Sequence, residues 1–264
     1  SASYSIASVA TTNAGDYYCI ISNSCNSVQT NSMALTVNTP PSISSLSNSA
    51  TKCNGENISI VVNAGGTSPL SYQWYEGSTA ISGAVSNVYA MYSLGSSDAG
   101  TYHCVITNSC GTTTSSNIVL TVNIAPTISS QSSNTAICAT SSASLSVTAA
   151  GTAPITYQWY NSSGSISGAT NNQYSINNAD TSDADNYYCI ITNSCGTTQS
   201  QNIALTVNQA PSILSQSTSA NKCVGESFSF NVSADGSNPL IYQWYNSQGS
   251  ILGANSSLYL INSL

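Results

Sequence analysis

The stretch Asp98-Ala99-Gly100-Thr101-Tyr102-His103-Cys104 decides the fold, and close copies of it occupy residues 13–19 and 183–189. The copies are 85 residues apart, and aligning the whole chain at this spacing needs no insertion or deletion. A period of this length corresponds to one small domain per repeat. The chain is therefore an array of similar domains, and its function should be one that an array performs.

Cysteine and tryptophan keep their places from repeat to repeat. The sets are Cys19, Cys104 and Cys189; Cys25, Cys110 and Cys195; Cys53, Cys138 and Cys223; and Trp74, Trp159 and Trp244. Proline, which interrupts strand pairing, follows a Val-Asn pair at each boundary between repeats. We predict the C-terminal part of a domain at 1–38, complete domains at 39–123 and 124–208, and the N-terminal part of a domain at 209–264. The sequence is thus expected to be a piece of a longer array.

Composition narrows the class of protein. Only 4% of the residues are charged and the net charge is -7, so the chain has no basic surface for nucleic acid. No apolar run is long enough to span a membrane. Nine cysteines at repeating positions are typical of an oxidising compartment. We therefore expect an extracellular protein, secreted or at the cell surface.

Apolar residues alternate with polar ones in short runs. The pattern covers residues 58–62, 72–75 and 118–122, and turn-forming residues separate the runs. A period of two predicts half-buried strands, and no segment has a helical period. About seven such strands per repeat predict an all-β chain of sandwiches joined head to tail.

These residues resemble a known family. Residues 55–60, 72–75 and 98–104 look like strands B, C and F of an immunoglobulin-like domain. The resemblance implies a core that contains the three tryptophans and the corner tyrosines Tyr17, Tyr102 and Tyr187. The low charge and the Asn-Ser-Cys turn look most like tandem repeats of large secreted bacterial surface proteins, which act as adhesins and fibres.

The chain departs from the family pattern at one cysteine. In the family, a cysteine on strand B bonds the cysteine on strand F, but valine stands at that place here, as Val62, Val147 and Val232. Buried cysteine without a partner behaves as a small apolar residue. We therefore expect buried free thiols at Cys19, Cys104 and Cys189.

The other two cysteine sets are expected at turns. Cys53 should lie at the end of its sandwich where the chain leaves, and Cys110 at the opposite end. A strand rises about 3.3 Å per residue, whereas the Cα atoms of a disulfide lie within about 7 Å, so these two cysteines should not pair. Because consecutive domains meet end to end, we predict an interdomain disulfide between Cys53 and Cys195. The remaining members would pair outside this sequence: Cys25, Cys110, Cys138 and Cys223.

The outer face of the sheet that carries the tryptophan is expected to be aromatic and nearly uncharged. An exposed face of this kind is often an association surface. We predict lateral contact between arrays here; the alternative is that surface tyrosines only reflect strand propensity. The predicted interface consists of Gln73, Tyr75, His103, Val105, Gln158, Tyr160, Tyr188 and Ile190.

Signals for catalysis or metal binding are weak. The single histidine, His103, should be exposed on a strand, and tyrosine replaces it in the other repeats, so no repeated Ser-His-Asp site exists. Asp180, Asp183 and Asp185 form a weak calcium candidate, with an ordinary polar loop as the alternative. We expect no cofactor and no enzymatic activity.

Two functions remain. The favoured one is a structural repeat of an extracellular fibre or filament, stiffened by interdomain disulfides and bundled laterally with other copies. The alternative is a ligand-binding adhesin or receptor ectodomain that recognises a glycan or protein through its loops.

Overall fold

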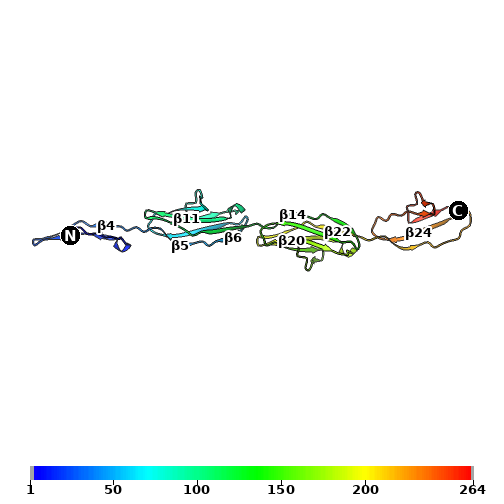
Figure 1. The fold of residues 1–264 in the computed structure, drawn as a ribbon, viewed down its shortest axis with the longest axis horizontal. Coiled ribbons are helices and arrows are strands. Elements are labelled where there is room, and N and C mark those ends of the chain that lie inside the picture. The colour runs from blue at the N-terminus through cyan, green and yellow to red at the C-terminus, as the bar shows by residue number, and fades with distance from the viewer. Residues whose placement is uncertain (1–2, 263–264) are drawn as a thin grey trace. The chain divides into compact units, whose positions relative to one another are not determined.

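The computed structural model describes residues 3–262, and the chain divides between Ile124 and Ala125 into two compact units. Each unit contains one complete β-sandwich and one incomplete one. Figure 1 shows the complete sandwiches in cyan to green and in green to yellow. The fold is all-β, as the sequence predicted. The helices of the described range are 3-10 turns of three residues each: η1 (Thr11–Asn13), η2 (Ser96–Asp98) and η3 (Thr181–Asp183).

The first complete sandwich consists of two sheets. One sheet has the order β10-β7-β5, and the other has the order β6-β13-β11-β8-β9, with β12 pairing the far end of β11. All pairs are antiparallel except β6 and β13, which run parallel. The strands are β5 (Ser42–Leu46), β6 (Ala50–Cys53), β7 (Ile58–Gly65), β8 (Ser71–Glu76), β9 (Thr79–Ala80), β10 (Val88–Met91), β11 (Gly100–Asn108), β12 (Gly111–Thr114) and β13 (Ile118–Asn123).

These nine strands exceed the seven predicted for two reasons. The first strand of the repeat divides, so that β5 pairs β7 in one sheet and β6 pairs β13 in the other. The last strand also divides, because β12 and β13 pair different parts of β11. The first strand therefore joins both sheets, which closes one edge of the sandwich.

The second complete sandwich repeats the arrangement of the first, with the same sheet orders. The strands of the two complete sandwiches cover residues 42–123 and 127–208. Its strands are β14 (Thr127–Gln131), β15 (Thr135–Cys138), β16 (Ala143–Ala150), β17 (Thr156–Asn161), β18 (Gly164–Ser165), β19 (Gln173–Ile176), β20 (Asp185–Asn193), β21 (Gly196–Gln199) and β22 (Ile203–Asn208).

The core of each complete sandwich forms around its tryptophan. Trp74 on β8 lies opposite Cys104 on β11 in the strand register, and both side chains are fully buried. The indole Nε1 of Trp74 donates a hydrogen bond of 2.9 Å to the carbonyl oxygen of Ser86, which satisfies its one polar atom. Strand alternation brings the two residues to the same inner face.

Each corner tyrosine closes the turn that precedes its strand. The hydroxyl of Tyr102 donates to the carbonyl oxygen of Asp98 at 2.8 Å, and Tyr187 makes the same bond to Asp183. Tyr17 donates to the carbonyl oxygen of Asn13 at 2.7 Å. The same local geometry thus recurs at the 85-residue spacing.

The two incomplete sandwiches differ from the prediction for the core. Tyr17 and Trp244 are only half-buried, and Cys19 is exposed rather than buried. These segments supply strands of only part of a sandwich, so no second sheet covers the side chains. The strands are β1 (Gly15–Tyr17), β2 (Ile20–Ser22), β3 (Ser27–Gln29), β4 (Met33–Leu35), β23 (Ser212–Gln216), β24 (Phe228–Asp235), β25 (Tyr245–Asn246), β26 (Gly249–Ser250) and β27 (Leu258–Ile261).

No helix in residues 3–262 has the length and apolar character that a membrane crossing requires.

Candidate functional site

The junction cysteines, meaning the Cys53 set and the Cys110 set, lie at opposite ends of a sandwich. Cys53 is the last residue of β6 and lies beside Asn123, the last residue of β13. Cys110 follows β11 at its other end, in the turn before β12. The nine residues of β11 span about 30 Å at about 3.3 Å per residue, far beyond the reach of a disulfide. One domain therefore cannot join its own two junction cysteines.

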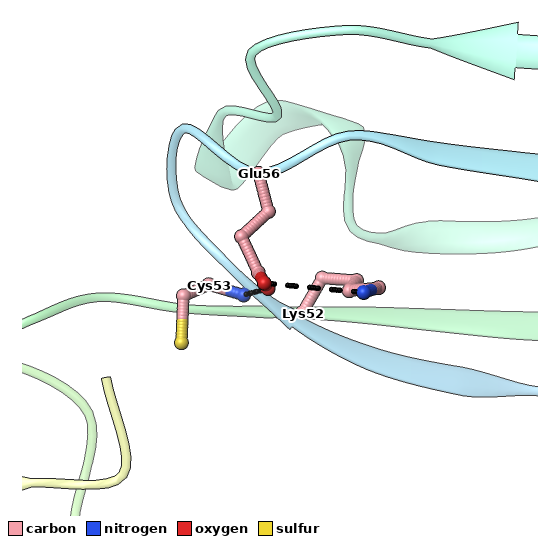
Figure 2. A network of polar contacts seen from close by, with 3 residues as sticks. All are labelled: Lys52, Cys53 and Glu56. Atoms are coloured by element: carbon pink, nitrogen blue, oxygen red, sulfur yellow. Dashed lines mark hydrogen bonds and ion pairs between the residues drawn. The ribbon is translucent and has the colours of Figure 1, made fainter.

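A carboxylate holds the backbone of Cys53. The Cys53 N–H donates to Oε2 of Glu56 at 2.6 Å, and Nζ of Lys52 lies 3.9 Å from Oε1 of the same group. The Glu56 N–H in turn donates to the carbonyl oxygen of Cys53 at 3.0 Å. Figure 2 shows the Glu56 carboxylate between Lys52 and the Cys53 amide, with the cysteine sulfur directed away from it.

The turn between Cys53 and Glu56 contains a glycine in a left-handed conformation. Gly55 has a φ of +87°, a conformation that costs other residues steric strain. Its N–H donates to the carbonyl oxygen of Leu94 at 2.7 Å, which fixes the turn to the neighbouring loop. The backbone of the turn thus places the Glu56 carboxylate over the Cys53 amide.

An asparagine holds the cysteine at the other end of the sandwich. The Cys195 N–H donates to Oδ1 of Asn193 at 2.9 Å, and the Asn193 amide donates to the carbonyl oxygen of Thr152 at 2.9 Å. Asn108 makes the matching bonds to Cys110 and Thr67. This role of asparagine was not among the predictions, although the repeated Asn-Ser-Cys motif was the signal for it.

The nine cysteines fall into two states. Cys53 and Cys195, both half-buried, are disulfide-bonded. The other seven are free thiols, of which Cys104 and Cys189 are buried. The exposed free thiols are Cys19, Cys25, Cys110, Cys138 and Cys223.

The buried thiols are chemically quiet. Burial raises the pKa of Cys104 and of Cys189 to about 11 each. The Cys104 N–H donates to Oγ of the buried Ser115 at 2.9 Å, and Ser200 does the same for Cys189 at 2.8 Å. A neutral thiol enclosed by apolar side chains is a poor nucleophile, so these two cysteines serve packing.

The predicted lateral interface is half-buried rather than exposed. Tyr75 stacks on His103 with ring centroids 5.1 Å apart, and Tyr160 stacks on Tyr188 at the same distance. These paired rings cover one another, which is why His103 is less exposed than expected. The half-buried residues of this face are Gln73, Tyr75, His103, Val105, Gln158, Tyr160, Tyr188 and Ile190.

The glutamines of this face are already engaged within their own domains. The Gln73 amide donates to the carbonyl oxygens of Trp74 at 2.9 Å and Ile81 at 2.7 Å, and Gln158 makes the equivalent bonds in the second complete sandwich. The amide groups of both glutamines therefore bind the adjoining hairpin of their own sheet.

The acidic loop does not converge on a metal site. Asp180 accepts hydrogen bonds from Ser182, and Asp185 accepts one from the Ser162 hydroxyl, and these bonds lower the pKa of both carboxyls. Asp183 accepts instead from the Asp180 N–H at 2.9 Å. Within residues 3–262, no three His, Cys, Asp or Glu side chains form a group that could hold a metal ion. The structure therefore favours the polar-loop interpretation over calcium.

Comparison with known proteins agrees with the architecture. A family model described as "Immunoglobulin domain" matches residues 40–108 and 125–193, together more than half of the chain. Hemicentin-1 of Mus musculus is 26% identical over 249 residues, which cover 88% of this chain and 4% of hemicentin-1. The chain thus spans a small part of that relative.

Solved structures share the fold at low sequence identity. The I-band fragment I67–I69 from titin has a TM-score of 0.67 at 16% identity, covering 85% of this chain and 89% of that one. The IG1 and IG2 domains of DIP-gamma have a TM-score of 0.51 at 17% identity, covering 63% and 97%. These similarities extend to the fold alone.

Proposed function

The chain belongs to the immunoglobulin domain family, and from this premise we propose that it is a non-enzymatic structural repeat of an extracellular fibre. In this proposal, Cys53 pairs with Cys195, so that a covalent bond joins consecutive domains. The domains are residues 39–123 and 124–208, flanked by parts of two others. The array would assemble with further copies of the same repeat into a fibre or bundle.

The oxidation state of the junction cysteines carries the proposal. Cys53 and Cys195 are disulfide-bonded, while the other seven cysteines are free thiols. Cys53 cannot reach Cys110 across its own sandwich, and Cys195 belongs to the complete sandwich that follows. A bond between them would remove bending freedom at the junction and would add about 2 to 4 kcal/mol against unfolding.

Peptide mapping without reduction tests the pairing. Digestion of the alkylated native chain should yield a peptide pair that contains Cys53 and Cys195, and this pair should disappear after treatment with dithiothreitol. Recovery of Cys53 linked to Cys110 as the main species would refute the proposal. The variant Cys53→Ser serves as the control, because it should leave Cys195 open to alkylation.

The extracellular location follows from the same chemistry. Disulfides persist outside the reducing cytosol, and the low charge of the chain does not favour binding to nucleic acid. Other copies of the repeat are the partners that this proposal requires. The resemblance to bacterial surface proteins remains a prediction, and the curated relative matched here is a mouse protein.

A further inference from the structure

We propose that Lys52 and Glu56 are positioning residues for the Cys53 disulfide, and that the array contains two classes of junction that differ in their resistance to reduction. This inference rests on the proposed pairing of Cys53 with Cys195. Junctions of the first class carry a carboxylate at the cysteine turn, and those of the second class lack it.

The repeats are numbered here by their Cys53-type cysteine: the first contains Cys53, the second Cys138 and the third Cys223. The first and third repeats carry the carboxylate. In the third repeat, the Cys223 N–H donates to Oε2 of Glu226 at 2.9 Å, and Nζ of Lys222 lies 4.0 Å from that oxygen. Gly225 has a φ of +90°, as Gly55 has +87° in the first repeat. The motif Lys-Cys-x-Gly-Glu therefore produces the same local geometry at two places in the chain.

The second repeat keeps the turn but lacks the carboxylate. Thr140 stands where glycine does in the others, with a φ of +71°, and its N–H donates to the carbonyl oxygen of Ala179 at 2.7 Å. The Ser141 N–H donates to the carbonyl oxygen of Cys138 at 3.1 Å, which matches the bond from Glu56 to Cys53. Ser141 and Ile137 replace the glutamate and the lysine. Cys138 thus has the same backbone turn in a neutral setting.

Two physical effects of the carboxylate favour the oxidised state. A hydrogen bond between charged and neutral groups restricts the Cys53 backbone before the sulfur bond forms, which lowers the ordering required for bonding. The nearby negative charge also destabilises the part of the reduced state in which Cys53 is a thiolate, and it does not act on the neutral disulfide. Lys52, whose Nζ lies 3.9 Å from Oε1 of Glu56, offsets part of the charge. The Cys53 junction should therefore resist reduction better than a junction of the Cys138 class.

The chain itself supplies the variants for a test. Glu56→Ala removes both the hydrogen bond and the charge, whereas Glu56→Gln keeps an acceptor oxygen and removes the charge. The triple variant Lys52→Ile, Gly55→Thr, Glu56→Ser gives the Cys53 turn the sequence of the second repeat. The matched control is Glu226→Ala, which removes the same hydrogen bond from the third repeat, remote in sequence from Cys53 and Cys195.

The experiment is a redox titration of the full chain in buffers of reduced and oxidised glutathione. Two glutathione thiols supply the two electrons and two protons that convert the disulfide to two thiols, and they leave as one molecule of oxidised glutathione. Peptide mapping after acid quenching and alkylation gives the fraction of Cys53 bonded to Cys195. Glu56→Ala and the triple variant should shift the equilibrium toward the reduced form by roughly fivefold to tenfold, the net effect of one typical hydrogen bond.

The outcomes separate the two proposals. A titration of Glu56→Ala that coincides with that of the unaltered chain, or a shift equally large in Glu226→Ala, would overturn the positioning role. A shift in Glu56→Gln as large as in Glu56→Ala would assign the effect to the charge of Glu56. No shift in Glu56→Gln would assign the effect to the hydrogen bond. Both of these results support the role of Glu56. Absence of the Cys53 to Cys195 peptide from the unaltered chain would refute the proposed function itself. Tryptophan fluorescence in urea shows whether each variant is folded.

Discussion

At the scale of single residues, the environment of each cysteine determines its chemistry. Cys104 and Cys19 occupy the same place in the repeat, but Cys104 is enclosed by two sheets and Cys19 is exposed. The thiolate is the reactive form of cysteine, and burial raises the pKa of Cys104 to about 11. Enclosure by a second sheet, rather than position in the repeat, therefore makes the thiol inert.

Alkylation of the native chain should reveal this difference. With a pKa of about 11, the thiolate fraction of Cys104 at pH 8 is about one part in a thousand, and access is blocked as well. Iodoacetamide should therefore modify Cys19 and leave Cys104 and Cys189 unmodified, as measured by mass spectrometry of peptides. The same reagent in 8 M urea should modify all three. Equal modification of Cys104 and Cys19 in the native chain would contradict the buried position.

At the scale of elements, a single side chain fixes the hairpin of β8 and β9. The Gln73 amide reaches the carbonyl oxygen of Ile81, just beyond β9, and the Ile81 N–H donates to the carbonyl oxygen of Trp74 at 2.9 Å. A two-residue strand such as β9 has few ladder bonds of its own. The glutamine therefore supplies much of the local restraint on this hairpin.

Substitution of this glutamine should loosen the hairpin without unfolding the sandwich. Gln73→Ala should lower the free energy of unfolding by about 1 to 2 kcal/mol, because two hydrogen bonds are lost from a half-buried site. Amide hydrogen exchange should accelerate at residues 79–84. The second complete sandwich, which keeps Gln158, is the internal control. Unchanged exchange at residues 79–84 would show that the ladder alone holds the hairpin.

Sequence alone predicted the strands and the core of the complete sandwiches, because alternation of apolar residues directly reflects which face is buried. It could not predict that Gln73 turns back onto its own hairpin, since this depends on how close β9 lies. Nor did it assign Glu56 or Asn193 to a cysteine amide, because such bonds depend on the backbone path of a turn. The repetition of these residues marked them, but repetition does not identify their partner.

At the scale of the whole molecule, repetition places similar surfaces along the array. Each complete sandwich presents one stacked aromatic pair, Tyr75 with His103 or Tyr160 with Tyr188, on a nearly uncharged face. Tyr245, at the next equivalent position, is 69% exposed. Weak contact at each repeat would add up along an array. We therefore keep the prediction that arrays associate laterally through this face.

Serine at three tyrosine positions should reduce self-association. In the triple variant of Tyr75, Tyr160 and Tyr245 to Ser, sedimentation velocity should show smaller species than the unaltered chain at the same concentration. Tyr92→Ser is the control, because Tyr92 is 75% exposed but lies outside this face. Identical sedimentation of the triple variant and the unaltered chain would count against lateral contact.

The parallel pairing of β6 with β13 has a mechanical consequence. Both strands end together, at Cys53 and Asn123, so tension applied beyond Asn123 acts along the ladder between them and must break its bonds collectively. A covalent attachment at Cys53 would transmit the same tension into β6, and two strands rather than one would then carry the load. Reduction at the junction would return the whole load to β13, which would make the extensibility of the array depend on the redox state of its surroundings.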